Sequence, residues 1–395
     1  MNRRIFMQAA AGSLLAGSVK AGLRKNKPTT VAVIGHTGHG NYGHGMDTLW
    51  LSFPQIKVIS IADQDKDGLQ KARERLKAER IYPKYQEMLR KEQPDLLCVA
   101  PRHIHEHRDM IMAGIKYGVK GIYVEKPFCR NLGEAEDIVA AAERSGVKIA
   151  LAHRNRYHPV LPRVQKLMDS GVAGEILEIK MRGKEDHRGG VQDLWVLGSH
   201  VLNLAPLFSG KLVACSATFY QDNRRADKTD LLEGDEGIGP VAGNRLHARF
   251  DSEKGIPVYF DSIKGKGTSD ANFGMQIIGT KGIFDIRIDT EPLVHFLPVN
   301  INKPKLNGQD WIAVSSQGIG EKESVKNLSQ LIEGHQAAVI DLMKCIQTNQ
   351  QPICNMYEGK ATVEAIMAVF RSHVQNGQRV LLSDSDRHNP LLDLM

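Results

Sequence analysis

The chain has 395 residues, of which 42% are hydrophobic and 25% charged, a composition that predicts a globular protein with room for about two domains. The formal charge is +7, but residues 1–27 contain Arg3, Arg4, Lys20, Arg24, Lys25 and Lys27 and no acidic residue, so that +1 remains for the rest. A nearly neutral remainder gives no support to nucleic-acid binding, which needs a basic surface.

The first 27 residues are typical of an export signal. Arg3 and Arg4 form a twin-arginine pair, and an apolar run over residues 9–19, too short to span a bilayer, follows them. Val19-Lys20-Ala21 resembles a cleavage site. We therefore expect residues 1–27 to send an already folded protein, with its cofactor bound, to the periplasm. The alternative is a disordered basic tail on a cytoplasmic protein.

A buried strand that runs into a glycine-rich turn organises the rest of the chain. The strand covers residues 31–34, and a helical pattern follows the turn as far as Trp50. This order of strand, turn and helix start is what binding of a dinucleotide pyrophosphate requires. The usual G-x-G-x-x-G spacing is imperfect here because the second glycine position holds a threonine. The expected cofactor contacts in this turn are Gly35, Thr37, Gly38, His39 and Gly40.

The second predicted strand, residues 57–62, ends at Asp63. A carboxylate at this place accepts hydrogen bonds from the adenosine ribose, which predicts a cofactor-binding role for Asp63. No arginine follows directly to receive a 2′-phosphate, so we expect NAD, with NADP as the alternative. The competing interpretation of Asp63 is a solvated turn residue.

Strands and helices alternate as far as about residue 153 and predict a doubly wound parallel sheet. The further strands are expected over 95–100, 121–124 and 148–152, and the helices over 67–79, 85–91, 106–117 and 132–145. Ligands of such sheets bind outside the carboxyl ends of the strands. That edge would carry Asp63, Pro101, His105, Glu125 and Lys126.

The second half of the chain predicts an α+β domain. Strands are expected over 176–181, 212–220, 244–250, 256–263, 274–278 and 283–286. The polar stretch 303–318 is expected to form a loop, and residues 328–347 and 358–374 have the periodicity of amphipathic helices.

Several short motifs follow one another along the chain: the glycine turn, Pro101-x-x-x-His105, Glu125-Lys126-Pro127, Arg156-Tyr157-His158-Pro159, Gly171 to Ile176, and Gly198-Ser199-His200. In this order they resemble the motifs of one enzyme family, the glucose-fructose oxidoreductase/inositol dehydrogenase/rhizopine catabolism (Gfo/Idh/MocA) family. The resemblance implies an NAD(P)-binding Rossmann domain over 28–153. It also implies a domain over 154–395 with a large, open, mostly antiparallel sheet, whose last helices pack back on the first domain. Members are sugar or cyclitol oxidoreductases, and we expect a homodimer or homotetramer.

Lys126 is the leading candidate for contact with the substrate hydroxyl. It follows a strand, and Pro127 biases its backbone to an extended form. A lysine near a cationic or apolar surface can exchange protons near neutral pH. The alternative is a surface lysine paired with Glu125. The resemblance implies that Glu125 is a structural or cofactor-facing carboxylate rather than a catalytic one.

The second catalytic candidate is His200. If residues 193–203 form one helix, Asp193, His200 and Asn203 share a face and could line a pocket. The resemblance implies proton transfer by His200 with an aspartate one turn earlier, but Val196 stands there. Asp193 is then the remaining acidic candidate, either for catalysis or for substrate binding. The competing interpretation of His200 is a satisfied core histidine.

Other polar residues complete the expected site. Family similarity implies that His105 lies at the nicotinamide end, and His39 faces the cofactor or solvent. The expected substrate contacts are Arg156, Tyr157, Lys184 and Asn203, with Arg154 and Glu185 as further candidates. A zinc site needs several ligands at fixed spacings. The histidines at 103, 105 and 107 are not accompanied by such further ligands, and the five cysteines show no paired metal-binding spacing, so no metal is expected.

These observations favour an exported NAD(P)-dependent oxidoreductase that acts on a secondary hydroxyl of a sugar, glycoside or cyclitol. Two alternatives stay open. One is a redox-neutral glycosidase or lyase that works through a transient keto-sugar and so keeps its cofactor. The other is a carbohydrate-binding protein without catalysis, which the valine at position 196 leaves open.

Overall fold

The computed structural model describes residues 28–266, 273–300, 308–384 and 387–394. The expected export signal, residues 1–27, therefore lies outside the described residues.

The N-terminal part is a parallel sheet with the strand order β3-β2-β1-β4-β5-β6, which confirms the predicted doubly wound sheet. Its strands are β1 (Thr29–Ile34), β2 (Ile56–Ala62), β3 (Arg80–Tyr82), β4 (Leu96–Val99), β5 (Gly121–Val124) and β6 (Lys148–Leu151). Every residue of β4, β5 and β6 is buried, as expected for a sheet with both faces covered. The covering helices include α1 (Lys66–Leu76), α2 (Tyr85–Glu92), α3 (His107–Lys116) and α4 (Leu132–Ser145).

The expected helix after the glycine turn is absent from this described stretch. Residues 35–47 form successive turns, and only a short 3₁₀ helix, η2 (Thr48–Ser52), follows them. The prediction was wrong because Gly38, Gly40 and Gly43 have positive φ values of 84°, 81° and 62°, which a right-handed helix does not allow. We name residues 35–47 the glycine loop.

The C-terminal part contains a ten-stranded, mostly antiparallel sheet, as predicted, in which β7 and β13 pair in parallel. The main strand order is β17-β16-β15-β14-β7-β13-β12-β8-β18, with β9 paired to β8. These strands are β7 (Ile176–Arg182), β8 (Leu212–Gln221), β9 (Arg224–Arg225), β12 (Arg245–Ser252), β13 (Val258–Ile263), β14 (Gly274–Gly279), β15 (Ile283–Arg287), β16 (Val294–Leu297), β17 (Ile312–Val314) and β18 (Val380–Leu381). The strand β17 lies within 303–318, so the loop prediction there was wrong for its described part.

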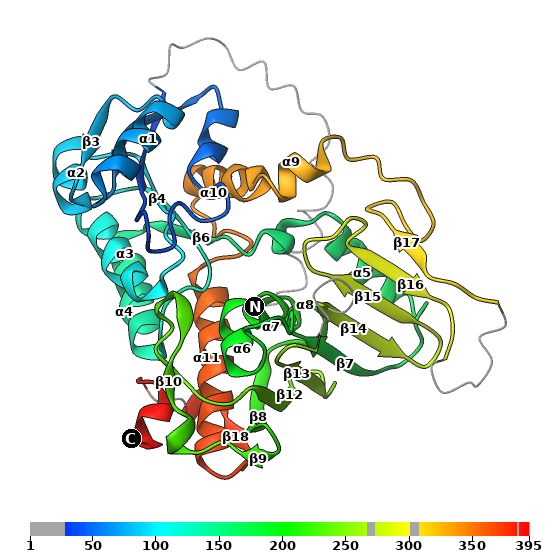
Figure 1. The fold of residues 1–395 in the computed structure, drawn as a ribbon. Coiled ribbons are helices and arrows are strands. Elements are labelled where there is room, and N and C mark those ends of the chain that lie inside the picture. Colours follow the sequence, from blue (N-terminus) through cyan, green and yellow to red (C-terminus); the bar gives the residue numbers. More distant parts are fainter. Residues whose placement is uncertain (1–27, 267–272, 301–307, 385–386, 395) are drawn as a thin grey trace.

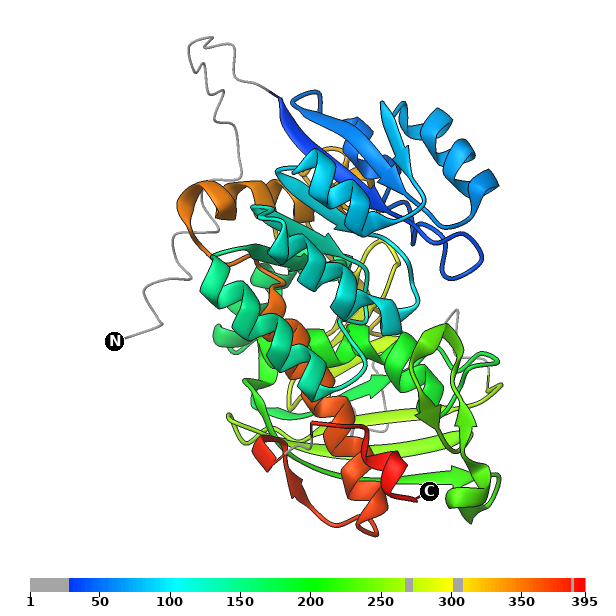
Figure 2. The ribbon, with the colours of Figure 1, turned by 90° about the vertical axis from the view of Figure 1, so that its left-hand side faces the viewer.

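One long helix joins the two sheets (Figures 1 and 2). The long α11 (Met356–Val374) packs against β8 of the large sheet and against α4 and β6 of the first part. The helix α10 (Gln336–Thr348) contacts β5 and β6. The remaining elements are α5 (Val160–Asp169), α6 (Val191–Val196), α7 (Gly198–Leu204), α8 (Pro206–Ser209), α9 (Leu328–Ile332), the ribbon β10 (Leu232–Glu233) and β11 (Pro240–Val241), and the 3₁₀ turns η3 (Ile104–Glu106), η4 (Arg154–Tyr157), η5 (Lys228–Asp230), η6 (Asp235–Gly237), η7 (Leu382–Asp384) and η8 (Pro390–Leu394).

Two predicted helices are broken. The helix expected over 328–347 is interrupted at His335, whose φ of 59° separates α9 from α10. The helix expected over 193–203 is split at Leu197 into α6 and α7. Both interruptions change which side chains share a face, and both lie beside the cavity described next.

Candidate active site

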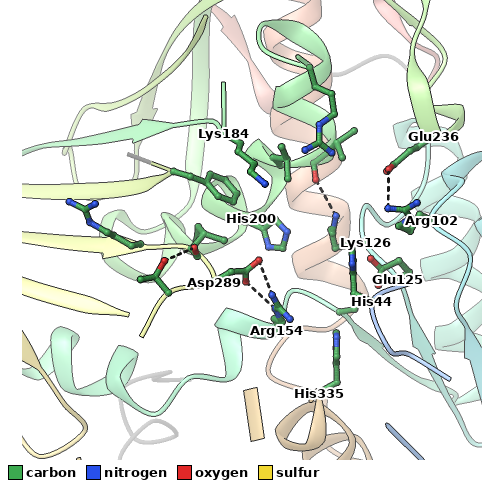
Figure 3. A pocket seen from close by; sticks show the side chains of 18 residues that line it. His44, Arg102, Glu125, Lys126, Arg154, Lys184, His200, Glu236, Asp289 and His335 are labelled. Atoms are coloured by element: carbon green, nitrogen blue, oxygen red, sulfur yellow. Dashed lines mark hydrogen bonds and ion pairs between the residues drawn. The ribbon is translucent and has the colours of Figure 1, made fainter. Parts of the chain in front are cut away.

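A cavity of about 460 Å³ lies where the carboxyl ends of the first sheet meet the C-terminal part (Figure 3). Glu125 and Lys126, which directly follow β5, form one side of it. Lys184, which follows β7, and His200 of α7 come from the C-terminal part. The charged and imidazole side chains that line it are His44, Arg102, Glu125, Lys126, Arg154, Lys184, Arg188, His200, Glu236, Arg287, Asp289 and His335.

Lys126 is only 5% exposed, and its Nζ donates a hydrogen bond to the carbonyl of Val196 at 3.2 Å. The alternative of a surface lysine paired with Glu125 is therefore wrong. The hydrogen bond crosses from the first sheet to α6, so it fixes the ammonium group inside the cavity. A lysine held there can donate a hydrogen bond to a substrate oxygen.

Glu125 is 1% exposed, and neither of its carboxylate oxygens has a hydrogen-bond partner among the described residues. Burial raises the pKa of this carboxyl to about 7, although the charge of Lys126 acts in the opposite direction. A buried carboxyl without a partner is costly. Its orientation toward the cavity fits a ligand that supplies hydrogen-bond donors.

His200 is buried on α7, and its Nδ1 has no hydrogen-bond partner within the described part of the chain. Burial, followed by the charge of Lys126, lowers the pKa of His200 to about 3. The imidazole is therefore neutral at pH 7 and can accept a proton. The ring of His153 lies edge-on at a centroid distance of 5.2 Å, and Phe273 lies on another side at 6.2 Å.

Asp193 does not line the cavity, which corrects the expectation that it shares a face with His200. Its carboxylate accepts hydrogen bonds from the backbone N–H groups of Lys184 and Glu185, at 3.2 and 3.0 Å. The hydroxyl of Ser262 donates a third, at 2.6 Å. The split between α6 and α7 turns Asp193 toward the loop after β7, where it orders the backbone.

Three predicted substrate contacts also lie outside the cavity. Arg156 donates to the carbonyl of Asn203 at 2.6 Å and pairs with Glu358 at 3.1 Å. The amide of Asn203 donates to the hydroxyl of Thr362 at 3.2 Å. Tyr157 donates to the carbonyl of Cys354 at 3.4 Å.

These contacts hold η4 and α7 against α11 and its preceding loop, so we correct Arg156, Tyr157 and Asn203 from substrate contacts to packing residues. Lys184 does line the cavity, as does Arg154. Glu185 is fully buried and binds Arg182 at 2.6 Å and the backbone of Ile263 at 2.8 Å.

The sequence analysis missed Asp289, His44 and His335, all of which line the cavity. Asp289 follows β15 with a φ of 57° and binds Arg154 and Asn155. Burial lowers the pKa of His44 to about 4, as it does for His335, whose Nδ1 lies 2.7 Å from the hydroxyl of Tyr123. One sequence signal could have pointed to Asp289, namely the turn-forming Asp-Thr-Glu-Pro stretch that follows a strand. No sequence signal indicated the break in the helix at His335.

Asp63 is buried, and its carboxylate is engaged within the chain, so its expected contact with the ribose stays a prediction. Its carboxylate accepts hydrogen bonds from the Thr37 backbone at 3.1 Å, the Thr37 hydroxyl at 2.7 Å and the Asp65 backbone at 3.0 Å. The carboxylate thereby holds the start of the glycine loop. The exposed Asp65 and Asp67 instead face a neighbouring cavity of about 410 Å³, which Thr37 and Tyr42 also line.

The rest of the glycine loop lies over the carboxyl ends of β4 and β5. A Cβ at Gly40 would lie 2.3 Å from the backbone nitrogen of Arg102, and one at Gly43 would lie 2.8 Å from the backbone carbonyl oxygen of Ala100. Such close backbone approach explains why glycine occupies these positions. The predicted Gly35 packs under Tyr42, whose ring a Cβ there would approach to 2.2 Å.

Four imidazoles, two from the glycine loop and two from the segment after β4, form a row. Ring centroids lie 4.6 Å apart for His36 and His39, 5.2 Å for His39 and His103, and 5.7 Å for His103 and His105. The predicted cofactor residues His39 and His105 are thus brought together at the surface.

Pro101 is buried, and its carbonyl accepts a hydrogen bond from the ring of His107 at 2.7 Å. Within the described ranges, no cluster of three or more His, Cys, Asp or Glu side chains could hold a metal ion. All five cysteines are buried and free. No described helix combines the length and the apolar character needed to cross a membrane.

A parallel sheet with a glycine loop after its first strand, and a cavity at its carboxyl edge, defines a Rossmann-type dinucleotide-binding protein. The sequence model of the oxidoreductase family with an NAD-binding Rossmann fold (GFO_IDH_MocA) matches residues 29–153. Residues 29–153 therefore belong to the NAD-binding Gfo/Idh/MocA family, as the motifs predicted.

Individual relatives agree with this assignment. D-apiose dehydrogenase from Paraburkholderia graminis is 26% identical over 253 residues, which is 59% of this chain. The chain spans 66% of that enzyme, just under two thirds of its length. An NAD-binding oxidoreductase from Klebsiella pneumoniae superposes with a TM-score of 0.67 at 19% identity, over 90% of this chain and 99% of its own.

Levoglucosan dehydrogenase in complex with NADH and L-sorbose gives a TM-score of 0.70 at 15% identity, over 90% of this chain and 98% of its own. At these identities the structural likenesses establish the fold across both sheets.

Proposed function

We propose that this protein is an NAD(P)-dependent oxidoreductase that transfers hydride between a secondary hydroxyl of a sugar, glycoside or cyclitol and a tightly held nicotinamide cofactor. The observation that carries the proposal is the shared cavity of Lys126 and His200 at the carboxyl edge of the NAD-binding sheet. The sugar is proposed because the aligned apiose and levoglucosan enzymes are named for sugar substrates.

The residues present fit the cofactor. The buried oxygens of Glu125, which lack a partner among the described residues, suit donors from the nicotinamide ribose or carboxamide. The glycine loop allows close approach of the pyrophosphate, and His39 and His105 belong to the row of imidazoles at this loop. Asp65, just after β2, accepts the hydrogen bonds from the adenosine ribose hydroxyls that are expected at the end of this strand. When bound, the nicotinamide ring supplies the hydride acceptor.

The chain's own residues then move the proton. Lys126 donates a hydrogen bond to the substrate hydroxyl and holds its oxygen. His200, neutral at pH 7, accepts the hydroxyl proton as the carbon loses its hydride. Lys184, Arg154 and Phe273 surround the space where the ring of the sugar would lie. The predicted catalytic role of Asp193 is not part of this proposal.

A redox-neutral glycosidase or lyase is the second candidate. One observation favours it: the same cavity holds a carboxyl with a pKa of about 7, Glu125, and a neutral imidazole, His200. Oxidation of the sugar to a ketone would acidify a neighbouring C–H, permit elimination of the aglycone, and then be reversed by return of the hydride. Such a cycle regenerates the cofactor without a second substrate.

The first experiment is to purify the protein without added cofactor, denature it and identify released nucleotides by mass. Stoichiometric NAD(H) or NADP(H) supports both enzymatic candidates and identifies the cofactor. Protein that is empty and fails to bind added NADH rejects them and leaves a non-catalytic carbohydrate-binding protein.

A substrate panel then separates the two enzymes. D-apiose, levoglucosan, D-glucose and myo-inositol are tested for net NADH formation, and p-nitrophenyl glycosides for release of nitrophenol. Net NADH supports the dehydrogenase, whereas nitrophenol without net NADH supports the redox-neutral enzyme.

We also propose export through residues 1–27 and assembly into a homodimer or homotetramer. Cell fractionation of the full chain and of an Arg3→Lys/Arg4→Lys variant tests export, because the variant should remain in the cytoplasm. Light scattering measures the oligomer, and a monomer would reject that part of the proposal.

A further inference from the structure

The cavity leaves His200 in need of an acidic partner. His200 is buried, and the charged groups that bear on it include Lys126 after β5, Arg154 of η4 and His44 of the glycine loop. His153 also lies against its ring. The cations Lys126 and Arg154 oppose protonation of the imidazole, so a proton transferred to His200 would create an imidazolium beside two positive charges.

Asp289 is the carboxylate that lies at this point. It lines the same cavity as His200, and Figure 3 shows its side chain between His200 and Arg154. It comes from the turn after β15, 89 positions beyond His200 in the sequence, so no helical spacing relates the two residues. An acidic residue was expected one turn before His200, but that position holds Val196, which carries no charge.

The structure holds Asp289 firmly in this place. Arg154 donates from Nε to Oδ1 at 2.9 Å, and its Nη2 lies 2.9 Å from Oδ2, so the guanidinium binds both oxygens. Asn155 donates a further bond at 3.0 Å. The φ of 57° is an uncommon conformation for aspartate, and such conformations persist where the surroundings fix them.

We infer that Asp289 is the carboxylate that supports proton transfer by His200, in place of the acidic residue absent from position 196. When the substrate O–H bond breaks, its proton moves to His200 and the hydride leaves carbon for the oxidised cofactor. Asp289 stays ionised and balances the imidazolium until the proton passes to water. Asp289 is thus a positioning residue that acts through His200, and the inference rests on the proposed function.

The ionised state of Asp289 agrees with this role. Burial alone would raise the pKa of Asp289, but the hydrogen bond from Arg154 and the charges of His200 and Arg154 bring it well below its usual range. The carboxylate therefore keeps its negative charge at every pH at which the protein is expected to work.

The test removes the charge and keeps the shape. Asp289→Asn should lower kcat for the most active substrate of the panel about 10- to 100-fold. The affinity for NADH and the KM should stay within about threefold, because neither depends on proton transfer. Asp289→Ala should lose a similar factor and regain activity with added formate but not with formamide, which has the same size and no charge.

A matched control comes from β15, the strand that precedes Asp289. Asp285 is a buried aspartate that pairs with an arginine of the cavity wall, Arg287, at 2.5 Å, but it does not line the cavity itself. Asp285→Asn also removes the carboxylate partner of an arginine, yet it should leave kcat within about threefold and show no response to formate. If Asp289→Asn fails to fold, the neutral pair Arg154→Gln/Asp289→Asn replaces it.

A measurement without turnover completes the test. Nuclear magnetic resonance of histidine-labelled protein, with His200→Gln to identify the signal, should give a lower pKa for His200 in Asp289→Asn than in wild type. An unchanged pKa, an unchanged kcat, or equal rescue by formamide overturns the inference. Wild-type protein that binds no NADH or converts no substrate rejects instead the proposed function, so the two failures are distinguishable.

Discussion

The two sides of the cavity are built in different ways. On the side of the first sheet, Glu125 and Lys126 directly follow β5, and the register of a buried parallel strand determines where they lie. On the other side, His200 follows a break between two short helices, and Asp289 lies in a turn with a positive φ. The first side is fixed by the fold, whereas the second is fixed by individual loop contacts such as the Arg154–Asp289 pair.

This comparison can be tested most directly at Lys126, where the largest effect is expected. Lys126→Met should lower kcat about 100- to 10,000-fold because it removes the donor that holds the substrate hydroxyl. Steady-state kinetics measure this loss, and fluorescence titration should give an NADH affinity within about threefold of wild type. Lys120→Met is the control, since Lys120 lies at the opposite end of the same strand and pairs with Asp95. Wild-type kcat in Lys126→Met would remove the lysine from the mechanism.

The difference between the two sides also explains what the sequence could predict. The first sheet and six strands of the second were predicted, because buried and alternating strands leave a direct pattern in the sequence. The open, antiparallel arrangement of the second sheet came from the family resemblance. The strand pattern also placed Glu125 and Lys126 at the carboxyl edge of the first sheet, and His200 was found through its resemblance to a family motif.

The errors arose where a single backbone torsion decides the direction of a side chain. The break at Leu197 turned Asp193 away from the cavity, and the left-handed conformation of His335 brought an unexpected imidazole into it. Asp289 reaches His200 from a distant turn, and no local pattern encodes such a contact. The glycine loop shows the same limit, since its glycines suggested a helix start and instead form turns.

The glycine loop gives the next prediction, which separates close packing from backbone conformation. Gly40→Ala should destabilise the protein by about 3 kcal/mol, because its positive φ is unfavourable for alanine and its Cβ meets the backbone of Arg102. Gly38→Ala has a similar φ of 84° with open space around its Cβ, so about 1 kcal/mol is expected. Urea unfolding of both variants measures the difference. Equal losses would show that the contact with the end of β4 is unimportant.

Glu125 predicts a pH-dependent stability that Glu125→Gln should remove. Its pKa is about 7 in the folded protein, above the usual value of 4.5, so the folded state binds the proton more tightly than the unfolded state. The free energy of unfolding should therefore fall as the pH rises from about 4.5 to about 7, by roughly 3 kcal/mol. Other groups titrate in this range, and the difference between wild type and Glu125→Gln isolates this carboxyl. Parallel stability curves for the two proteins would contradict the assignment.

The smallest effect is expected at Asp65, and it distinguishes the two acidic residues after β2. The side chain of Asp65 accepts a hydrogen bond from the backbone of Gly68 at 2.6 Å and so caps α1. Asp65→Asn should keep this cap, because asparagine caps helices equally well, and stability should change by less than about 0.5 kcal/mol. NADH should bind about tenfold more weakly, since a charged acceptor for the ribose hydroxyls is lost.

Asp63→Asn should show the reverse, with a loss of stability of about 1–2 kcal/mol, because its carboxylate holds the backbone and hydroxyl of Thr37. If Asp63→Asn instead weakens NADH binding and leaves stability unchanged, the ribose role returns to Asp63, and the glycine loop must open when the cofactor binds.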